Sequence, residues 1–483
     1  PEARVYPYGL YKAAWSKYNL QDENGGMQLL EQVVAYGHER AKAGANVAKL
    51  DLRKEALGDL ALFFSEARKP GDAVAYFTAQ SGDLDPVPYI LRLVEIYERH
   101  SKYSEVDVVL RSVLSKLPGS TQIALVHEKL IWNADRQKRR EVSVQQMVDL
   151  DRACDAFDAK LPERKECDAK VIEVSKKLGA KLHAYWKKDK SADTADQALK
   201  VYDIYLKNAT LVGHEAAQVR YAFSDLLFAR ARFREASENY AIVNVNPVPD
   251  AKKQAFDLMR VDPKLAVDAA YGAVVSLEKA VGDDKWNDAD EVLFGKLSDQ
   301  YLARAPQGPY ALDLKFKRAF IAYEKEKYDV AATGFKQIGW AVYPSEAMAT
   351  NAKVLKAQDL YLDILNIRKD YAGLKESAQA LLARATAASS ATPAGKTREE
   401  QLSKIRREAW FAEVGEVEQK DAPKAVEMYK AFAMENRTSD LAPRAWWNAS
   451  QILFRSGDAS GGASMCSEMN RMFPGSANAK ECL

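Results

Sequence analysis

Proline and glycine are scarce in this chain, with 17 and 24 residues among 483. These two residues are the strongest helix breakers, so their scarcity favours helix throughout. No apolar run approaches the ~18 residues that a membrane-spanning helix needs, so we expect no transmembrane segment. An excess of charge of one sign is also missing, because 70 basic and 68 acidic residues leave a formal net charge of +2. Since the two signs alternate along the chain, we expect no nucleic-acid partner.

Motifs that carry catalysis or hold a metal are missing as well. The sequence contains no GxxxxGK[ST] phosphate loop, no HExxH and no GxSxG. Its five histidines are far apart, and no cysteines have CxxC spacing. The acidic cluster at 283–291 lacks the glycine and the terminal glutamate of a calcium loop. The sequence therefore predicts a protein that is not an enzyme and has no cofactor and no metal site.

The four cysteines form two local pairs. Cys154 and Cys167 flank a turn at 161–163, and Cys466 and Cys482 flank a turn at 473–476. Each pair lies where two antiparallel helices would meet, so each can close a disulfide if the Cα atoms lie within about 7 Å. Two disulfides would indicate an oxidising compartment. The alternative is four reduced thiols buried between helices.

What the sequence does contain is a helical hairpin pattern, clearest at residues 86–118. One apolar stripe runs along the first half of this segment and a second along the other half, and Pro118 closes it. The stripes are Ile90, Leu93, Val94 and Tyr97, then Tyr103, Val106, Leu110 and Val113. This is the two-helix tetratricopeptide pattern. One such unit cannot bury its apolar face alone, so the pattern predicts stacked copies.

Related patterns recur along the chain, with steps that vary and weaker signatures in the middle. We count ten or eleven hairpins, at 10–34, 53–80, 86–118, 119–160, 164–206, 217–245, 262–304, 310–343, 356–384, 405–435 and 442–474. We expect a small residue early in each second helix, which would let the two helices pack closely, and an aromatic residue four positions later, which would fill the groove between them. The predicted fold is all-α, a right-handed α-solenoid of tetratricopeptide-like hairpins that is irregular in the middle.

The quality of the pattern divides the chain into six segments. We expect N-terminal hairpins at 1–118, degenerate long-helix hairpins at 119–206, one good unit plus degenerate hairpins at 207–304, good units at 305–384, a loop or linker at 385–398, and C-terminal units with a cap at 399–483. The linker is predicted because its residues are small and polar and include proline and glycine. A shorter break is predicted at 244–250.

Three stretches resemble bacterial envelope proteins with tetratricopeptide repeats. They are PYGLYKAAWSKYNL at 7–20, LAPRAWWNA at 441–449 and MFPGS at 472–476. They are similar to repeats of the Tol-Pal accessory type, of outer-membrane assembly lipoproteins and of gliding-motility arrays. The resemblance implies a periplasmic scaffold that binds envelope proteins. The chain begins at Pro1 without an initiator methionine. We therefore expect a processed product, from which a signal peptide or a lipid anchor at the outer membrane would already be removed.

Candidate binding residues lie on the predicted first helix at 217–231. There, Tyr221, Asp225 and Phe228 fall beside the apolar stripe and would point toward the groove of the solenoid. Aromatic rings beside a carboxylate are suitable anchors for a peptide. The competing interpretation is that Tyr221 and Phe228 pack against neighbouring repeats.

The predicted function is a non-enzymatic protein-interaction scaffold of the bacterial envelope that binds partners in this groove. Two alternatives remain open at this stage. One is a solenoid that binds, or acts on, cell-wall glycan or peptide, which would require paired carboxylates converging in a pocket. The other is a cytoplasmic adaptor with tetratricopeptide repeats, which reduced cysteines would favour.

Overall fold

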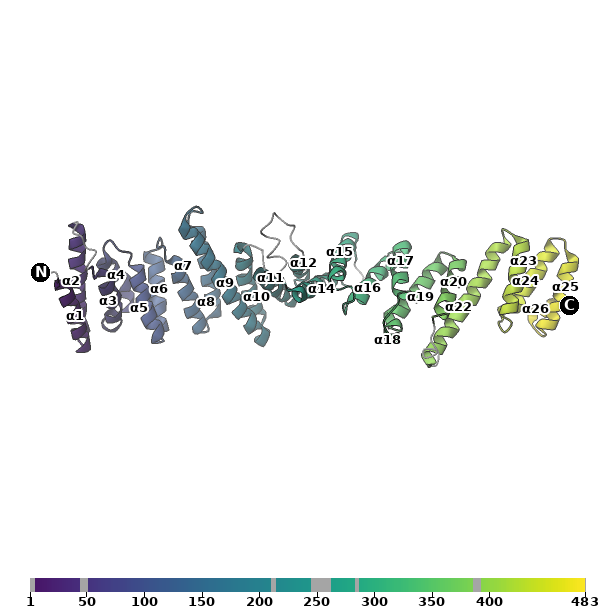
Figure 1. Cartoon of the computed structure of the whole chain (residues 1–483), viewed down its shortest axis with the longest axis horizontal. Helices are drawn as coiled ribbons and strands as arrows, with labels where there is room; N and C mark the ends of the chain where they lie inside the picture. The colour runs from purple at the N-terminus through teal and green to yellow at the C-terminus, as the bar shows by residue number, and fades with distance from the viewer. Residues whose placement is uncertain are drawn as a thin grey trace. The chain divides into compact units, whose positions relative to one another are not determined.

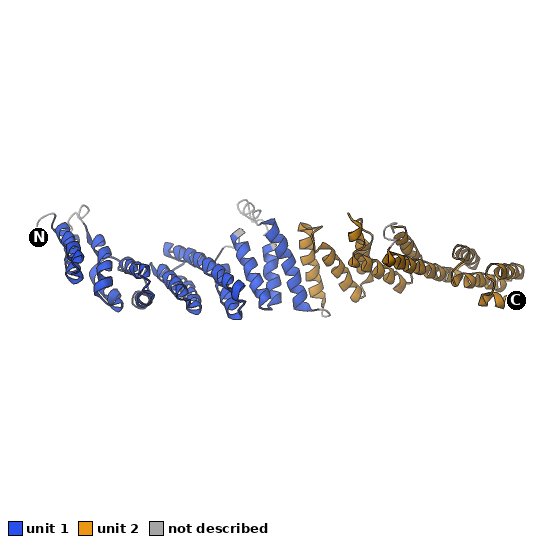
Figure 2. Ribbon diagram, turned by 90° about the horizontal axis from the view of Figure 1, so that it is seen from below, with its two compact units in different colours: residues 1–285 blue, residues 286–483 orange. Residues whose placement is uncertain are grey.

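The structure is a computed structural model that describes residues 5–43, 51–209, 214–244, 262–282, 286–384 and 392–482. Every regular element in these residues is helical, and they contain no β-strand. The chain divides into two compact units, residues 1–285 (unit 1) and residues 286–483 (unit 2), which Figure 2 shows in blue and orange. The prediction of an all-α fold is confirmed.

Unit 1 consists of consecutive helices of variable length, the longest being the 28-residue α9. Its described helices are α1 (Tyr6–Asn19), α2 (Glu23–Lys42), α3 (Arg53–Ala67), the short 3₁₀ helix η1 (Pro70–Asp72), α4 (Ala73–Ser81), α5 (Val87–Arg99), α6 (Tyr103–Lys116), α7 (Ile123–Arg136), α8 (Arg140–Asp155), α9 (Pro162–Asp189), α10 (Ala192–Asn208), α11 (His214–Ala229), α12 (Phe233–Asn244) and α14 (Pro263–Val281).

Unit 2 also consists of consecutive helices and ends in a short one. Its described helices are α15 (Asp288–Arg304), α16 (Ala311–Glu324), α17 (Tyr328–Gly339), α18 (Glu346–Ala349), α19 (Ala352–Ile367), α20 (Tyr371–Leu382), α22 (Pro393–Glu418), α23 (Ala422–Glu435), α24 (Leu441–Arg455), α25 (Ala459–Met472) and α26 (Ala477–Glu481).

Within each unit, helices adjacent in sequence pack side by side as hairpins, and each hairpin packs on the next (Figure 1). In unit 1, for example, α1 packs on α2 and α2 packs on α3. In unit 2, α16 packs on α17, which in turn packs on α19. This lateral stacking is the tetratricopeptide-like arrangement that the sequence predicts. Below, the first helix of a hairpin means the N-terminal one.

Most hairpins turn through one residue with a left-handed backbone. Such a residue lies between the two helices of eight hairpins, at Gln21, Ser101, Lys138, Lys190, Ala231, Glu326, Lys369 and Gly457. In several of these turns the next backbone N–H donates to a carbonyl five residues earlier, as Lys102 does to Tyr97 at 2.9 Å. This bond pattern satisfies the carbonyls left open at a helix end. The shared turn explains why the hairpins keep one geometry although their helix lengths differ.

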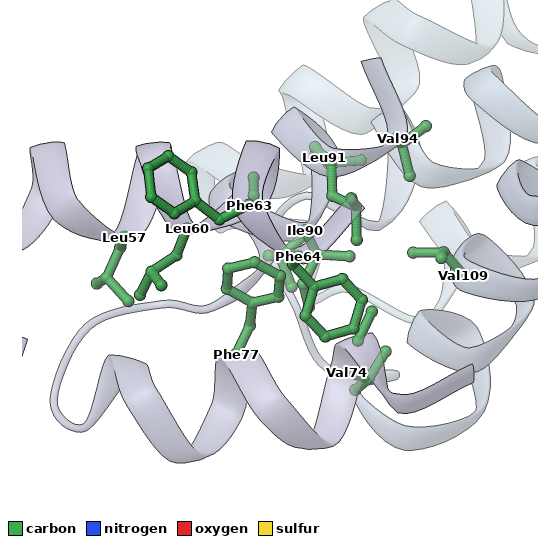
Figure 3. Close-up of a cluster of buried hydrophobic side chains, with 14 of the residues drawn as sticks. Leu57, Leu60, Phe63, Phe64, Val74, Phe77, Ile90, Leu91, Val94 and Val109 are labelled. Carbon is green, nitrogen blue, oxygen red and sulfur yellow. The ribbon is translucent and has the colours of Figure 1, made fainter. Parts of the chain in front are cut away.

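The core is an apolar seam that continues from one hairpin to the next. Figure 3 shows Phe64 of α3, Phe77 of α4 and Ile90 of α5 meeting in one such cluster, each with 0 % of its surface exposed. The predicted pairing of a small residue with an aromatic residue four positions later is confirmed. The buried pairs are Ala73 with Phe77, Ala236 with Tyr240, Ala331 with Phe335 and Ala425 with Tyr429.

One glycine marks a close approach of two long helices. Gly179 of α9 faces the buried ring of Tyr202 on α10, and a Cβ at this glycine would lie 2.5 Å from ring carbons. We expect Gly179→Ala to destabilise unit 1 by about 1–3 kcal/mol, because overpacking outweighs the gain in helix propensity. At Gly9 of α1, where a Cβ would meet nothing within 4 Å, the same change is expected to stabilise by roughly 0.5–1 kcal/mol. Urea unfolding followed by circular dichroism measures both. Equal effects at the two positions would contradict the close approach.

The two predicted breaks fall largely outside the described residues. Residues 245–250 of the first and 385–391 of the second are not described. Within the predicted linker, α22 already begins at Pro393, because Thr392 caps it by accepting a hydrogen bond from the Gly395 N–H at 3.0 Å. A threonine followed by proline is a helix-start signal, so these residues extend a helix instead of a loop.

Candidate functional site

The three residues predicted to bind partners lie half-buried on α11. The Tyr221 ring packs edge-on against Tyr240 of α12, with ring centroids 5.3 Å apart. The Tyr240 hydroxyl donates a hydrogen bond to the Asp225 carboxylate. Phe228 packs edge-on against Phe233, with centroids 5.1 Å apart. The structure therefore joins Tyr221 and Asp225 through Tyr240 and gives Phe228 a separate neighbour.

Burial dominates the electrostatics of this cluster. Desolvation raises the pKa of Asp225, and the hydrogen bond from Tyr240 opposes that rise. Burial also raises the pKa of Tyr221 to about 12, so the phenol is neutral at physiological pH. The cluster thus presents two half-buried aromatic rings and one desolvated carboxylate. Its role in partner binding stays a prediction.

Sequence reasoning did not identify a cavity in unit 2 that lies between α19, α20 and α22. Its volume is about 480 Å³, within the range of about 300–1,000 Å³ typical of ligand sites. α19 and α22 are the first helices of successive hairpins, and α20 is the second helix of the α19 hairpin. We name this space the α19–α22 cavity.

The α19–α22 cavity has an apolar floor and a polar rim. Buried side chains of Leu362, Leu374 and Ala409 form the floor. The rim on α19 consists of Asp359, Asp363 and Asn366, whose spacing of four and then three residues places them on one face of the helix. Glu408 of α22 lines the opposite side. The spacing of these three polar residues along α19 is the signal that could have revealed the rim.

The rim carboxylates differ in how they are paired. Asp359 forms an ion pair with the Arg398 guanidinium, which also donates to the Gln358 side chain at 3.2 Å. Asp363 accepts a hydrogen bond from the Tyr323 hydroxyl of α16 at 2.5 Å. That bond raises the pKa of Tyr323 to about 12, so the phenol keeps its proton and donates at neutral pH.

An aromatic run on α16 leads up to this rim. The rings of Phe316 and Phe320 are stacked at 6.0 Å between centroids, and those of Phe320 and Tyr323 at 6.4 Å. All three side chains are half-buried and pack against the edge of the core. Part of each ring remains accessible.

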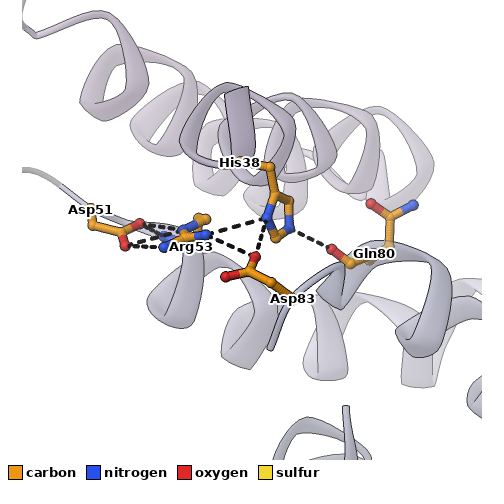
Figure 4. A network of polar contacts seen from close by, with 5 residues as sticks. All are labelled: His38, Asp51, Arg53, Gln80 and Asp83. Atoms are coloured by element: carbon orange, nitrogen blue, oxygen red, sulfur yellow. Dashed lines mark hydrogen bonds and ion pairs between the residues drawn. The ribbon is translucent and has the colours of Figure 1, made fainter. Parts of the chain in front are cut away.

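A polar network in unit 1 is a structural clamp and not a second site (Figure 4). Arg53, with only 8 % of its surface exposed, donates to Asp51 at 2.8 Å and to Asp83 at 3.2 Å. The His38 ring contacts Asp83 and the Gln80 carbonyl oxygen, each at 3.0 Å. These contacts tie α2, the start of α3 and the end of α4 together. Hydrogen bonds from Arg53 also hold the pKa of Asp51 below its usual value.

Gly82 is required at the centre of this clamp. Its φ of +59° is a left-handed backbone, and a Cβ there would lie 2.8 Å from the His38 ring. Only glycine satisfies both conditions without strain. The groups of the clamp are therefore occupied by one another, which accounts for the buried guanidinium of Arg53 without a ligand.

The four cysteines are joined in the two pairs that the sequence predicts. Cys154 of α8 is bonded to Cys167 of α9, with Cα atoms 5.5 Å apart. Cys466 of α25 is bonded to Cys482, which follows α26, with Cα atoms 5.2 Å apart. Each bond fastens consecutive helices across their connection.

The described residues contain neither a metal-binding cluster nor a membrane-spanning helix. Across the described ranges, no group of His, Cys, Asp and Glu side chains is arranged to hold a metal ion. None of the described helices is long and apolar enough to cross a membrane.

No protein-family model matches the sequence, and no curated protein matches it. The chain is similar to a chain in the structure of Naa15/Naa10 bound to HypK-THB, with 12% identity and a TM-score of 0.28 over 97% of this chain. It is also similar to yeast Tom70, with 12% identity and a TM-score of 0.18 over 99% of this chain and 94% of Tom70.

The match to the first of these structures covers 64% of that longer chain. TM-scores this low establish no shared partner or function. The class of protein follows from the helices themselves. The chain is a helical-repeat protein built from stacked tetratricopeptide-like hairpins.

Proposed function

We propose that this chain is a non-enzymatic scaffold of the bacterial cell envelope that binds other proteins along the first helices of its hairpins. The observation that carries the proposal is the α19–α22 cavity, since it lies between the first helices of two successive hairpins. Side chains on such helices stay accessible when hairpins stack, because the seam buries only their other faces. The cavity combines an apolar floor with a few polar groups, as recognition sites for proteins and peptides do.

Two features support the envelope as the location. Both cysteine pairs have disulfide geometry, which fits an oxidising compartment such as the periplasm. The stretches at 7–20, 441–449 and 472–476 resemble periplasmic repeat proteins, some of which are anchored at the outer membrane. The proposed partners are therefore envelope proteins.

Affinity capture tests this function. Immobilised protein is incubated with envelope and cytosolic extracts of the source bacterium, and bound proteins are identified by mass spectrometry. We expect specific capture from the envelope extract, reduced in the variant Tyr221→Ala/Phe228→Ala. The exposed Tyr8, with 49 % of its surface accessible, provides the control Tyr8→Ala. Circular dichroism verifies that each variant is folded.

One result of this capture would contradict the proposal, and another would relocate the binding surface. Capture from the cytosolic extract alone would contradict the envelope assignment. Unchanged capture by the α11 variant would move the binding surface away from Tyr221 and Phe228.

A second candidate function, binding of cell-wall glycan or peptide, is favoured by one observation. Asp359, Asp363 and Glu408 line one cavity, and a glycan site needs such converging carboxylates. Two of them are already engaged, since Asp359 is ion-paired and Asp363 accepts a hydrogen bond. A co-sedimentation assay with purified peptidoglycan separates the two candidate functions. A protein scaffold is expected to stay in the supernatant and to release no soluble fragments from the peptidoglycan.

A further inference from the structure

We propose that the α19–α22 cavity binds a peptide segment of a partner protein through a lysine or arginine side chain. The aliphatic part of that side chain lies on the apolar floor, and its cationic head reaches the carboxylates of the rim. This inference rests on the proposed scaffold function and names the chemistry of the partner. Three observations carry it: the floor, the charge of the rim and the aromatic run beside it.

The floor fits the stem of a long cationic side chain. Leu362, Leu374 and Ala409 are no more than 6 % exposed as whole residues, yet they line the cavity. Lysine and arginine bury their methylene groups on apolar surface while the charged head stays at a polar edge. An apolar floor beside a charged rim suits such residues better than a purely apolar or a purely charged ligand.

The rim keeps negative charge that the protein does not neutralise internally. Asp359 is matched by Arg398, but Asp363 accepts its hydrogen bond from a neutral phenol. Glu408 lies 3.8 Å from Lys404 on the same helix, and both side chains are more than half exposed, so solvent screens that pair. In the described part of unit 2, no ion pair involves Asp363. Asp363 and Glu408 therefore attract a cation from a ligand.

The aromatic run on α16 extends the surface beyond the cavity. Tyr323 links this run to Asp363 by its hydrogen bond, so the Phe316 and Phe320 rings continue from the rim. Asn366, exposed at the rim, can both donate to and accept from a peptide backbone. A segment with one basic residue and a neighbouring apolar residue would use all these groups.

The test first selects peptides that bind the protein and then removes the negative charges of the cavity rim. Phage-displayed random 12-residue peptides are selected on the intact chain, and the best binders are synthesised and titrated by fluorescence polarisation. We expect a consensus that contains Lys or Arg beside an apolar residue. We expect Asp363→Asn/Glu408→Gln to weaken binding at least tenfold, and added salt to weaken wild-type binding. The matched control is Glu376→Gln/Glu416→Gln, which removes two exposed carboxylates of α20 and α22 that do not line the cavity.

Any of three results would overturn the inference. They are a consensus without a basic residue, equal weakening of binding by the control variant, and unchanged affinity of Asp363→Asn/Glu408→Gln. If Asp363→Asn unfolds the hairpin, the exposed Glu408→Gln alone must still weaken binding several-fold. A change in the molar mass of the double variant by light scattering would instead identify a second copy of this chain as the occupant.

Failure of this inference is distinguishable from failure of the scaffold function. If envelope proteins are captured equally by wild type and by Asp363→Asn/Glu408→Gln, the scaffold function stands and the basic-peptide site is wrong. If the wild type captures no envelope protein, the scaffold function itself fails.

Discussion

Replacing Cys154 and Cys167 together by alanine is expected to lower the free energy of unfolding of unit 1 by about 3 kcal/mol. The bond joins the end of α8 to the first turns of α9 and closes a loop with a sequence separation of 13. Opening it restores entropy to the unfolded chain, whereas the native helices keep their other contacts. Alanine is preferred to serine because both sites are buried, with 1 % and 3 % exposed, and a hydroxyl there would lack a partner.

The second disulfide provides the matched comparison. Cys466→Ala/Cys482→Ala is expected to release α26, since a five-residue helix is not stable by itself. Hydrogen exchange with mass spectrometry should show faster exchange at 140–189 in the first variant and at 459–482 in the second. Thiol titration of unfolded, unreduced protein should find no free thiol. Four free thiols would remove the main support for the envelope and favour the cytoplasmic adaptor.

The stability of unit 1 is expected to fall as the pH drops from 7.5 to 5, by about 2 kcal/mol from His183 alone. This histidine of α9 is 5 % exposed and packs edge-on against Trp186, with ring centroids 5.4 Å apart. Burial, helped by Lys187 and Lys190, lowers its pKa to about 4. Among the described residues its Nε2 has no hydrogen-bond partner.

The direction of this effect follows from where the proton binds. In the unfolded chain the histidine has its ordinary pKa of 6.5, so between pH 6.5 and about 4 the unfolded state binds a proton that the folded state excludes. The stabilisation is therefore complete above pH 6.5 and is lost as the pH falls toward 4. Urea unfolding at several pH values measures the slope.

Two variants isolate the histidine. His183→Phe keeps an aromatic ring of similar shape and removes the titration, so its stability should depend less on pH than that of the wild type. The control is His100→Gln, which replaces an exposed histidine of the same unit without disturbing the core. If the wild type and His183→Phe have parallel slopes, the buried neutral state of His183 is wrong.

Local sequence encodes those interactions whose partners lie a few residues apart. The hairpin at 86–118 was predictable because one stripe of apolar residues decides which face of each helix is buried, and the stripe is visible at fixed spacing. The pairing of Ala331 with Phe335 was predictable for the same reason, since residues four apart share a helix face. The cysteine pairs were predictable because a short turn brings their helices together.

Two other features of the structure could not be predicted from the local sequence. Phe316, Phe320 and Tyr323 have the spacing of core residues, but the structure leaves them half-buried, because their burial depends on how closely the next hairpin approaches. The turn residues Ser101, Lys138 and Lys369 adopt left-handed backbones. None of them is the glycine that usually marks this conformation, so the sequence does not predict it.

The amino-acid pattern by itself determined the helices, their pairing into hairpins and the stacking, because these depend on contacts a few residues apart and on the need to bury a stripe. Only the tertiary structure decided where carboxylates and apolar floor meet in the α19–α22 cavity and which of those carboxylates remain unneutralised. Arg398 and Tyr323 reach Asp359 and Asp363 from helices about forty residues away in sequence. Such contacts depend on the spacing of neighbouring hairpins, which no local pattern specifies.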